Sequence, residues 1–193
     1  MSFWDFKASF YDRLRRWPII RRIHEREKKY LSQLLEPLEA PPVIVDLGTG
    51  TGASLDFFPD STLIGLDSSL QMIRSTVKLG IAGVAADACR LPIQTRSIPF
   101  VSAIGLTEYL RDIDAFMEEI RRVLRSGGIA LVTISPPVLL NRMRTLLGHR
   151  LHLIRETDWE SSIRELGFVL TARERSAMQT AFLIKLSGPS SVS

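Results

Sequence analysis

A glycine-rich turn is the first feature of the chain whose residue types point to ligand binding. Asp46 begins the run Asp-Leu-Gly-Thr-Gly-Thr-Gly, which places Gly48, Gly50 and Gly52 directly after a short apolar segment. Glycines at a strand-to-helix turn let the backbone approach a ligand closely, and free N–H groups at the helix start face an acceptor. A turn without a ligand is the less favoured interpretation, because alternating glycines weaken a helix start. The cofactor stays open at this point, since Gly48, Gly50 and Ala53 also satisfy the relaxed dinucleotide fingerprint.

Two more acidic residues end apolar segments further along the chain. Asp67 comes nineteen residues after Gly48, where a carboxylate can accept hydrogen bonds from both ribose hydroxyls of an adenosine. Asp87 follows the next segment and is placed to face the adenine amino group, although a lone aspartate is more often a cap or turn former. Together with Asp46, these acids end three successive strands and converge on one crevice.

The elements that must position these residues alternate between short apolar runs and helical patterns. This alternation predicts parallel strands joined by crossovers. We predict strands at 43–47, 62–67, 83–86, 100–105 and 129–134, and helices at 54–58, 69–79 and 112–125, the last stopping at Gly127-Gly128. Thr157 to Glu160 reads as a capping box that starts a further helix ending at Gly167. Strands at 168–173 and 180–186 follow with a short connection, which requires an antiparallel pair.

The predicted fold class is therefore α/β, a Rossmann-like doubly wound sheet of seven strands, mostly parallel with an antiparallel C-terminal hairpin strand. A chain of 193 residues fits one domain. It shows no apolar run of membrane-spanning length and no signal-peptide pattern, so we expect a cytoplasmic protein. The single Cys89 cannot form an internal disulfide or a cysteine-rich metal site, and a structural role is favoured for it.

The basic character of the chain is confined to its N-terminal segment. The net charge is +4, but residues 1–35 hold nine Lys or Arg against four Asp or Glu, and the rest is nearly balanced. Nucleic acid is therefore not an expected partner. We divide the chain into N-terminal helices at 1–42, a cofactor-binding domain at 43–187 and a disordered tail at 188–193.

The N-terminal segment also carries an aromatic stripe. At 100° per residue one face of the first helix collects apolar side chains, namely Phe3, Phe6, Phe10, Leu14 and Trp17. Arginines follow this stripe, so two interpretations stay open. The segment either packs on the domain as a lid, which is favoured, or docks on an anionic membrane at the inner face and delivers an amphiphilic substrate.

At this point the sequence resembles the class I S-adenosylmethionine-dependent methyltransferases, within the small-molecule group that includes ubiquinone and menaquinone biosynthesis enzymes. The resemblance rests on four motifs in order, namely residues 43–52, residues 64–68 with Met72, residues 86–88 with Leu91-Pro92, and residues 122–130. One departure is Ile98-Pro99, which stands where such families often have Phe-Asp. The chain also lacks Asn-Pro-Pro-Tyr or Asp-Pro-Pro-Tyr after the fourth strand, so methylation of DNA bases is disfavoured.

The resemblance implies S-adenosylmethionine as cofactor. Gly48 and Gly50 would line its methionine moiety, Asp46 would meet its ammonium, Asp67 its ribose and Asp87 its adenine. An aromatic residue of an N-terminal helix often covers the cofactor in related enzymes, which makes Tyr11 a candidate beside the alternative that it packs on the domain. The full set of candidate cofactor-binding residues is Tyr11, Asp46, Gly48, Thr49, Gly50, Gly52, Asp67, Ser68, Met72, Asp87, Ala88, Gly105 and Leu106.

The catalytic candidates are Glu108 and Tyr109, next to the fourth strand. The sulfonium already activates the methyl group, so the enzyme chiefly positions a nucleophile, and a base is optional. Glu108 as a solvated loop acid and Tyr109 as a partly packed ring are the simpler interpretations. The three histidines are taken as surface residues, and no metal is predicted.

No sequence motif identifies the methyl acceptor. The segment 136–155 mixes apolar and basic residues, which suits an amphiphilic or anionic small molecule, but an ordinary packed helix would look similar. Two other functions stay open. One is a cofactor-binding regulator or partner subunit without transferase activity, and the other is a nicotinamide-dependent dehydrogenase, which is disfavoured because no catalytic domain follows the core.

Overall fold

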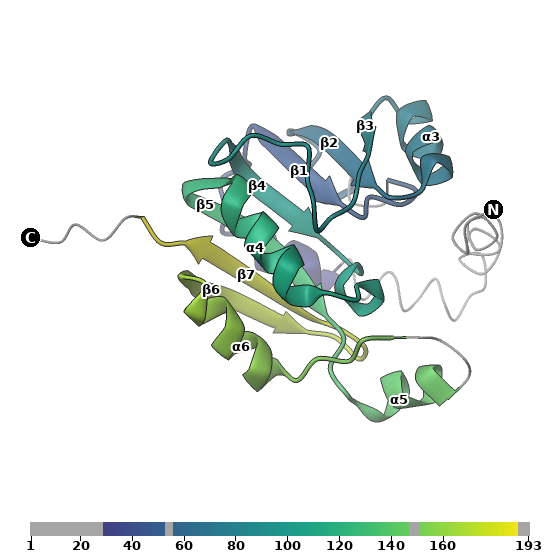
Figure 1. The fold of residues 1–193 in the computed structure, drawn as a ribbon, viewed down its shortest axis with the longest axis vertical. Coiled ribbons are helices and arrows are strands. Elements are labelled where there is room, and N and C mark those ends of the chain that lie inside the picture. Colours follow the sequence, from purple (N-terminus) through teal and green to yellow (C-terminus); the bar gives the residue numbers. More distant parts are fainter. Residues whose placement is uncertain (1–28, 53–55, 147–150, 189–193) are drawn as a thin grey trace, which may run out of the picture.

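The computed structural model describes residues 29–52, 56–146 and 151–188, which form one twisted sheet with helices on both faces (Figure 1). Within these residues the sheet has seven strands in the order β3-β2-β1-β4-β5-β7-β6. All neighbouring strands pair in parallel except β7, which runs antiparallel to both β5 and β6. The strands are β1 Val43–Leu47, β2 Thr62–Asp67, β3 Ala82–Ala85, β4 Ile98–Ala103, β5 Leu124–Ile134, β6 Phe168–Arg175 and β7 Thr180–Leu186. The fold class predicted from the sequence is confirmed.

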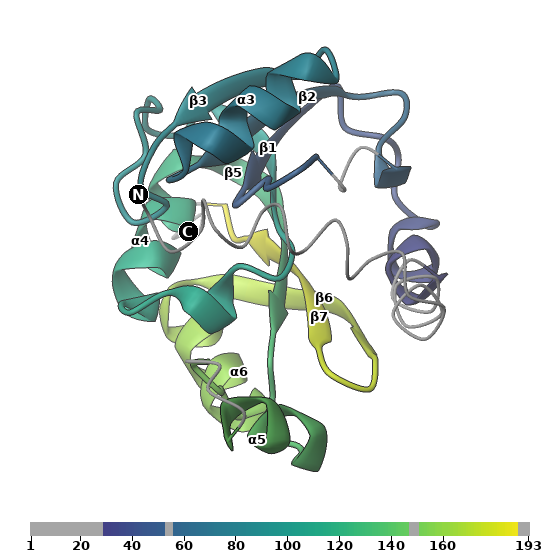
Figure 2. The same cartoon turned by 90° about the vertical axis from the view of Figure 1, so that its right-hand side faces the viewer.

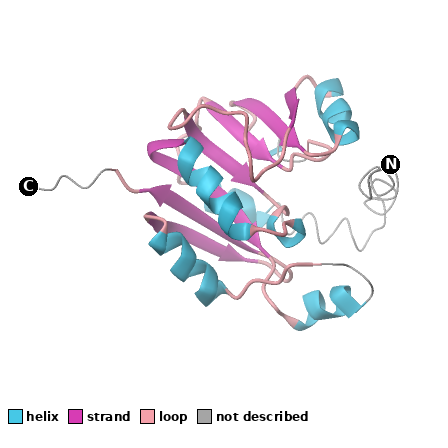
Figure 3. Ribbon diagram, viewed as in Figure 1, coloured by secondary structure: helices cyan, strands magenta, loops and turns pink. Residues whose placement is uncertain are grey.

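Helices cover both faces of the sheet (Figures 2 and 3). They are residues 29–35, α3 Leu70–Lys78, the 3-10 turn η2 Thr107–Tyr109, α4 Ile113–Val123, α5 Leu139–Leu146 and α6 Glu156–Glu165. Apolar faces of α4 and α6 bury Phe116, Ile120 and Trp159 against one side of the sheet. Leu31 and Leu34 of residues 29–35 are buried on the other side. None of the described helices is long and apolar enough to cross a bilayer.

The junction between α4 and β5 differs from the prediction. The helix ends at Val123, and β5 begins at the next residue, so Gly127 and Gly128 lie inside a strand and do not stop the helix. Leu124 pairs with Ile98 before the register shifts, which extends both β4 and β5 toward their amino ends. Long-range strand pairing therefore ends the helix at this junction.

Two smaller helix predictions also need correction. Thr157 is not a cap, because α6 begins at Glu156 with Arg155 as an N-cap that makes no side-chain bond. The Glu156 carboxylate instead binds Arg175 and the Thr180 hydroxyl, which ties α6 to the β6–β7 hairpin. Of the helix predicted at 54–58, residues 54 and 55 lie outside the described residues, and of the other three only 56 and 57 are helical, as a 3-10 turn.

Candidate cofactor site

The carboxyl ends of the parallel strands place the glycine-rich turn at one edge of the sheet. The turn leaves β1 with Gly48, Gly50 and Gly52 at φ of 68°, 53° and 79°, a left-handed backbone that favours glycine. At Gly48 a Cβ would lie 2.8 Å from a side-chain carbon of Leu106, so this turn and the loop after β4 pack closely. Two predicted cofactor residues, distant in sequence, are thereby brought together.

Thr49 faces away from this edge. Its side chain is buried against Gly65 of β2, where a Cβ would lie 2.8 Å from the threonine methyl. The hydroxyl has no hydrogen-bond partner among the described residues. Any contact of Thr49 with a cofactor must therefore come from its backbone.

Asp46 is held in place by a residue that the sequence did not single out. Ser102 of β4 lies directly opposite Asp46 in the parallel register, and its hydroxyl donates a 2.5 Å hydrogen bond to Asp46 Oδ1. Both residues are buried. A serine in an apolar strand is a weak signal on its own, and only the pairing of β1 with β4 reveals its role.

Asp67 ends β2 and organises the backbone around it. Its Oδ2 accepts a 3.0 Å bond from the N–H of Gly50, and its Oδ1 accepts a 2.8 Å bond from the N–H of Ser69. Ser69 in turn caps α3 by accepting from the N–H of Met72, whereas Ser68 is exposed. The carboxylate is thus oriented at the strand end, directly beside the glycine turn.

Asp87 and Ala88 follow β3 at the same edge. Asp87 is exposed, and its Oδ1 accepts a 2.9 Å bond from the N–H of Cys89, so it shapes the turn. Partial burial, with the nearby carboxylates of Asp87 and Asp112, raises the pKa of the Cys89 thiol. The thiol is therefore kept protonated, in line with a structural role.

An ion pair on α4 fixes the loop that follows Asp87. Arg122 donates to Glu119 and to the carbonyls of Leu91 and Ile93 at 2.8–3.0 Å. Glu119 also accepts a 3.1 Å bond from the N–H of Leu91. The hydrogen bond from Arg122 lowers the pKa of Glu119 against the opposing effect of its partial burial. The loop beside the predicted adenine site is therefore fastened to the helix below it.

Glu108 lies in η2, next to the end of β5. Only 4% of it is exposed, so the interpretation as a solvated loop acid is wrong. The Ser135 hydroxyl donates to its carboxylate, and its main-chain carbonyl accepts a 2.7 Å bond from the N–H of His152. Its neighbour Tyr109 is partly buried. Residues 152 and 154 are thus hydrogen-bonded to the main chain of Glu108 and of Ser135.

Gly105 and Leu106 form the loop between β4 and η2. The Gly105 N–H donates to the Thr133 hydroxyl at 2.7 Å, and Gly105 takes a left-handed φ of 69°. A Cβ at Gly105 would lie 3.5 Å from the side-chain nitrogen of Gln179, in the β6–β7 turn. The hairpin turn therefore borders the loop that the sequence placed beside the cofactor.

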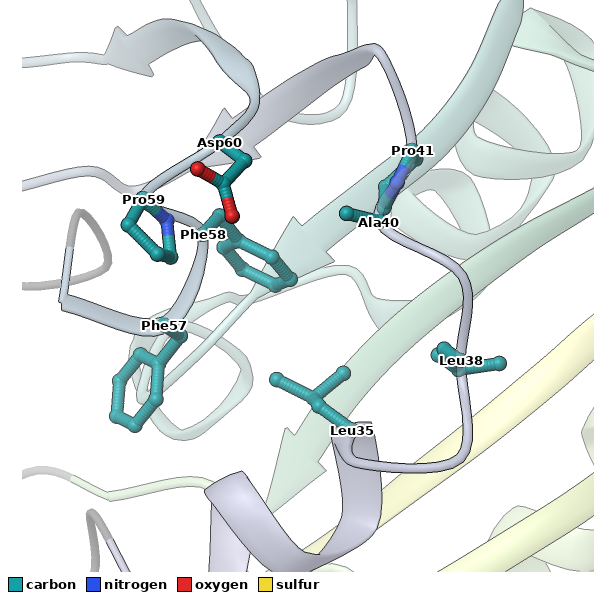
Figure 4. Close-up of a pocket in the computed structure, with 8 residues that line it drawn as sticks. All are labelled: Leu35, Leu38, Ala40, Pro41, Phe57, Phe58, Pro59 and Asp60. Carbon is teal, nitrogen blue, oxygen red and sulfur yellow. The ribbon is translucent and has the colours of Figure 1, made fainter.

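Tyr11 lies outside the described residues, as does the aromatic stripe. A pocket lined by apolar side chains is found at the opposite edge, at the amino ends of β1 and β2 (Figure 4). Leu35, Leu38, Phe57 and Phe58 point into it, and Asp60 stands at its side. It shares no residue with the candidate site. Among the described residues no group of three or more potential ligands is arranged to hold a metal ion.

Comparison with known proteins finds similarity to methyltransferases over the central part of the chain. Residues 45–132 match the family described as a methyltransferase domain. A malonyl-[acyl-carrier protein] O-methyltransferase of Marinomonas is 38% identical over 114 residues, and a demethylmenaquinone methyltransferase of Roseiflexus castenholzii is 34% identical over 113 residues. These matches cover 53% and 52% of this chain, but only 42% and 47% of the relatives, so the chain spans less than half of their length.

Solved structures agree on the fold. Magnesium protoporphyrin IX methyltransferase from Synechocystis, with bound S-adenosylhomocysteine, superposes with a TM-score of 0.73 at 16% identity, covering 94% of this chain and 96% of that one. A methyltransferase from Haloferax volcanii in complex with its activator Trm112 superposes with a TM-score of 0.72 at 16% identity, covering 98% and 99%. The fold is thus shared with methyltransferases over nearly its whole length.

Proposed function

We propose that this chain is a class I S-adenosylmethionine-dependent methyltransferase, which transfers the methyl group of that cofactor to a small-molecule acceptor. The observation that carries the proposal is the pairing of Asp67 with the glycine turn. The Asp67 carboxylate at the end of β2 accepts a hydrogen bond from the Gly50 N–H, and an acidic residue at this strand end binds the ribose in dinucleotide-binding folds, which supports the proposal.

The remaining cofactor contacts are proposed from the same edge of the sheet. Gly48 and Gly50 would line the methionine moiety, and Asp46 would meet its ammonium directly or through water. Asp87 is exposed after β3, and it is the residue that we propose for the adenine amino group. The support is that β1, β2 and β3 are adjacent and parallel, so their carboxyl ends lie side by side.

Calorimetric titration with S-adenosylhomocysteine and with NAD, side by side, tests the cofactor assignment. We expect S-adenosylhomocysteine to bind and NAD to give no heat of binding. The reverse result would identify a dinucleotide-binding protein. Binding of S-adenosylhomocysteine without methyl transfer to any acceptor would instead favour a regulator or partner subunit.

The acceptor is proposed to be amphiphilic or anionic. The support is the segment 136–155, which combines α5 with exposed Arg142 and Arg155, and which returns over Glu108. Asn141, fully buried, donates to the carbonyls of Pro136 and Met178 and so holds α5 to the β6–β7 turn. The relatives are named as methyltransferases of malonyl-[acyl-carrier protein], demethylmenaquinone and trans-aconitate, so a radiolabelled methyl-transfer screen would begin with these acceptors.

In the proposed reaction the acceptor heteroatom or carbon attacks the methyl carbon. The bond from that carbon to sulfur breaks, and S-adenosylhomocysteine leaves with the bonding electrons. Where the acceptor must lose a proton, the Glu108 carboxylate would take it as general base. The protein otherwise contributes by alignment and by exclusion of water.

Replacing Glu108 by glutamine tests this role. We expect kcat to fall about fivefold while affinity for S-adenosylhomocysteine stays within about twofold, because the amide keeps the size of the side chain but does not accept a proton. This decrease in kcat is smaller than for an enzyme that requires a base, since the sulfonium already activates the methyl group. Initial rates and calorimetry on the same preparation provide the two values.

The matched control is Glu118→Gln, which changes an exposed glutamate of α4 paired with Arg121. It should leave both rate and affinity unchanged. If Glu108→Gln has the same kcat as the unaltered protein, Glu108 has a structural role in η2 and no part in proton transfer.

A further inference from the structure

We propose that Thr76 of α3 is a positioning residue for the cofactor, because its hydroxyl holds the glycine turn in the conformation that binds. The proposal rests on the function proposed above and assigns a role to a helix residue that no motif includes. Thr76 touches neither the acceptor nor the reacting methyl group in this scheme.

The first observation is that α3 buries the hydroxyl of Thr76, although packing alone does not require a polar group at this position. Thr76 is 0% exposed, and a β-branched residue in a helix is a modest cost to helix stability. Its hydroxyl donates to the carbonyl of Gly50 at 2.9 Å, and the carbonyl of Met72, one turn back, lies at 3.1 Å as a second acceptor. A valine or alanine would satisfy the packing of this position. The contact with Gly50 explains the hydroxyl.

The second observation is that Gly50 is held on both sides. Its N–H donates to Asp67 at 3.0 Å, and its carbonyl accepts from Thr76. Asp67 also accepts from Ser69, which caps the same helix α3 that carries Thr76. The glycine turn is therefore bonded to Asp67 at the end of β2, 17 residues from Gly50, and to Thr76 in the last turn of α3, 26 residues from Gly50.

These two hydrogen bonds matter because glycine has greater backbone freedom than any other residue type. A glycine at φ of 53° samples many conformations unless its two peptide groups are bonded. Holding the turn before the cofactor arrives lowers the ordering cost of binding. The carboxylate of Asp67 has about four lone-pair positions, so it can keep both backbone donors and still accept two ribose hydroxyls. The hydrogen bonds that hold the glycine turn can thus be kept when the cofactor is bound.

The test compares Thr76→Val, which removes the hydroxyl at nearly constant volume, with Thr76→Ser, which keeps it. S-adenosylhomocysteine is the probe, measured by calorimetry on the full chain. We expect Thr76→Val to weaken binding about threefold to tenfold, the range for one lost hydrogen bond, and Thr76→Ser to bind like the unaltered protein. With an acceptor in hand, KM for S-adenosylmethionine should rise in Thr76→Val while kcat is retained.

The adjacent Ser75 supplies the matched control. Its hydroxyl donates to the carbonyl of Gln71 one turn back, the same bond within the helix, but from an exposed position. Ser75→Ala should leave affinity unchanged. If the valine variant does not fold, Thr76→Ala and Thr76→Ser form a second pair that differs in the hydroxyl. Melting temperatures of all variants show which of them are folded. Equal affinity of the folded hydroxyl-free and hydroxyl-bearing variants would overturn the role of Thr76, whereas absent binding by the unaltered protein would overturn the proposed function itself.

Discussion

Replacing Gly50 by arginine is expected to abolish binding of S-adenosylhomocysteine while the protein stays folded. A Cβ at Gly50 would meet nothing closer than the Gly48 carbonyl oxygen at 3.8 Å, so the new side chain can leave the backbone without a clash. It must then extend over the carboxyl edge of the sheet, into the space proposed for the methionine moiety. Calorimetry should detect no binding at ligand concentrations that saturate the unaltered protein.

The fold should survive because the cost is confined to the backbone. A residue other than glycine in a left-handed conformation costs about 1–2 kcal/mol, a tolerable fraction of the stability of a domain. We therefore expect a lower melting temperature with an unchanged circular dichroism spectrum.

Gly80→Arg separates this backbone cost from the loss of binding. Gly80 has φ of 82°, open space around its Cβ position and a place in the turn between α3 and β3, at the opposite edge of the sheet. This variant should lose stability to a similar extent and bind S-adenosylhomocysteine normally. A folded Gly50→Arg protein with normal affinity would remove the glycine turn from the cofactor site.

The parts of the fold that follow from local pattern could be predicted from the sequence. β1, β2 and β7 begin and end where their apolar runs meet turn residues, at 43–47, 62–67 and 180–186. The antiparallel β6–β7 pair follows from the short connection between its strands. In each case the signal lies within the segment itself.

The α4–β5 junction and the start of α6 could not be predicted in this way, because partners distant in sequence decide them. Leu124 joins β5 through its pairing with Ile98, in place of a further turn of helix. α6 begins at Glu156, one residue before the predicted cap Thr157, and the Glu156 carboxylate binds Arg175 and Thr180 of the β6–β7 hairpin. A helix-capping pattern carries no information about contacts with a hairpin that follows later in the chain.

The same distinction applies to the candidate site. The aspartates at strand ends are visible in the sequence because a strand end is a local feature. The residues that hold the site are not visible in this way. Ser102 bonds to Asp46, Ser135 to Glu108 and Thr76 to Gly50, and these pairs form only once the sheet is assembled. The main-chain bonds from His152 to Glu108 and from Ile154 to Ser135 likewise join segments that are far apart in the sequence.

Replacing Asp67 by alanine is expected to weaken binding of S-adenosylhomocysteine by about 1.5 to 3 kcal/mol, which is about tenfold to a hundredfold, the range for hydrogen bonds to a charged group. Two effects combine. The ribose hydroxyls lose their acceptor, and the N–H groups of Gly50 and Ser69 lose the carboxylate that fixes the glycine turn to the start of α3. Isothermal calorimetry, or displacement of labelled ligand where affinity is low, measures the change.

A ligand lacking the ribose 2′-hydroxyl distinguishes these two effects. Removing that hydroxyl should weaken binding to the unaltered protein but make little further difference to Asp67→Ala, because groups that contact each other are not additive in their effects. Asp60→Ala, which removes an exposed carboxylate at the amino end of β2, is the control and should bind both ligands normally. If the two losses were fully additive, Asp67 would act only by holding the turn, and the ribose would be bound by another residue at this edge of the sheet.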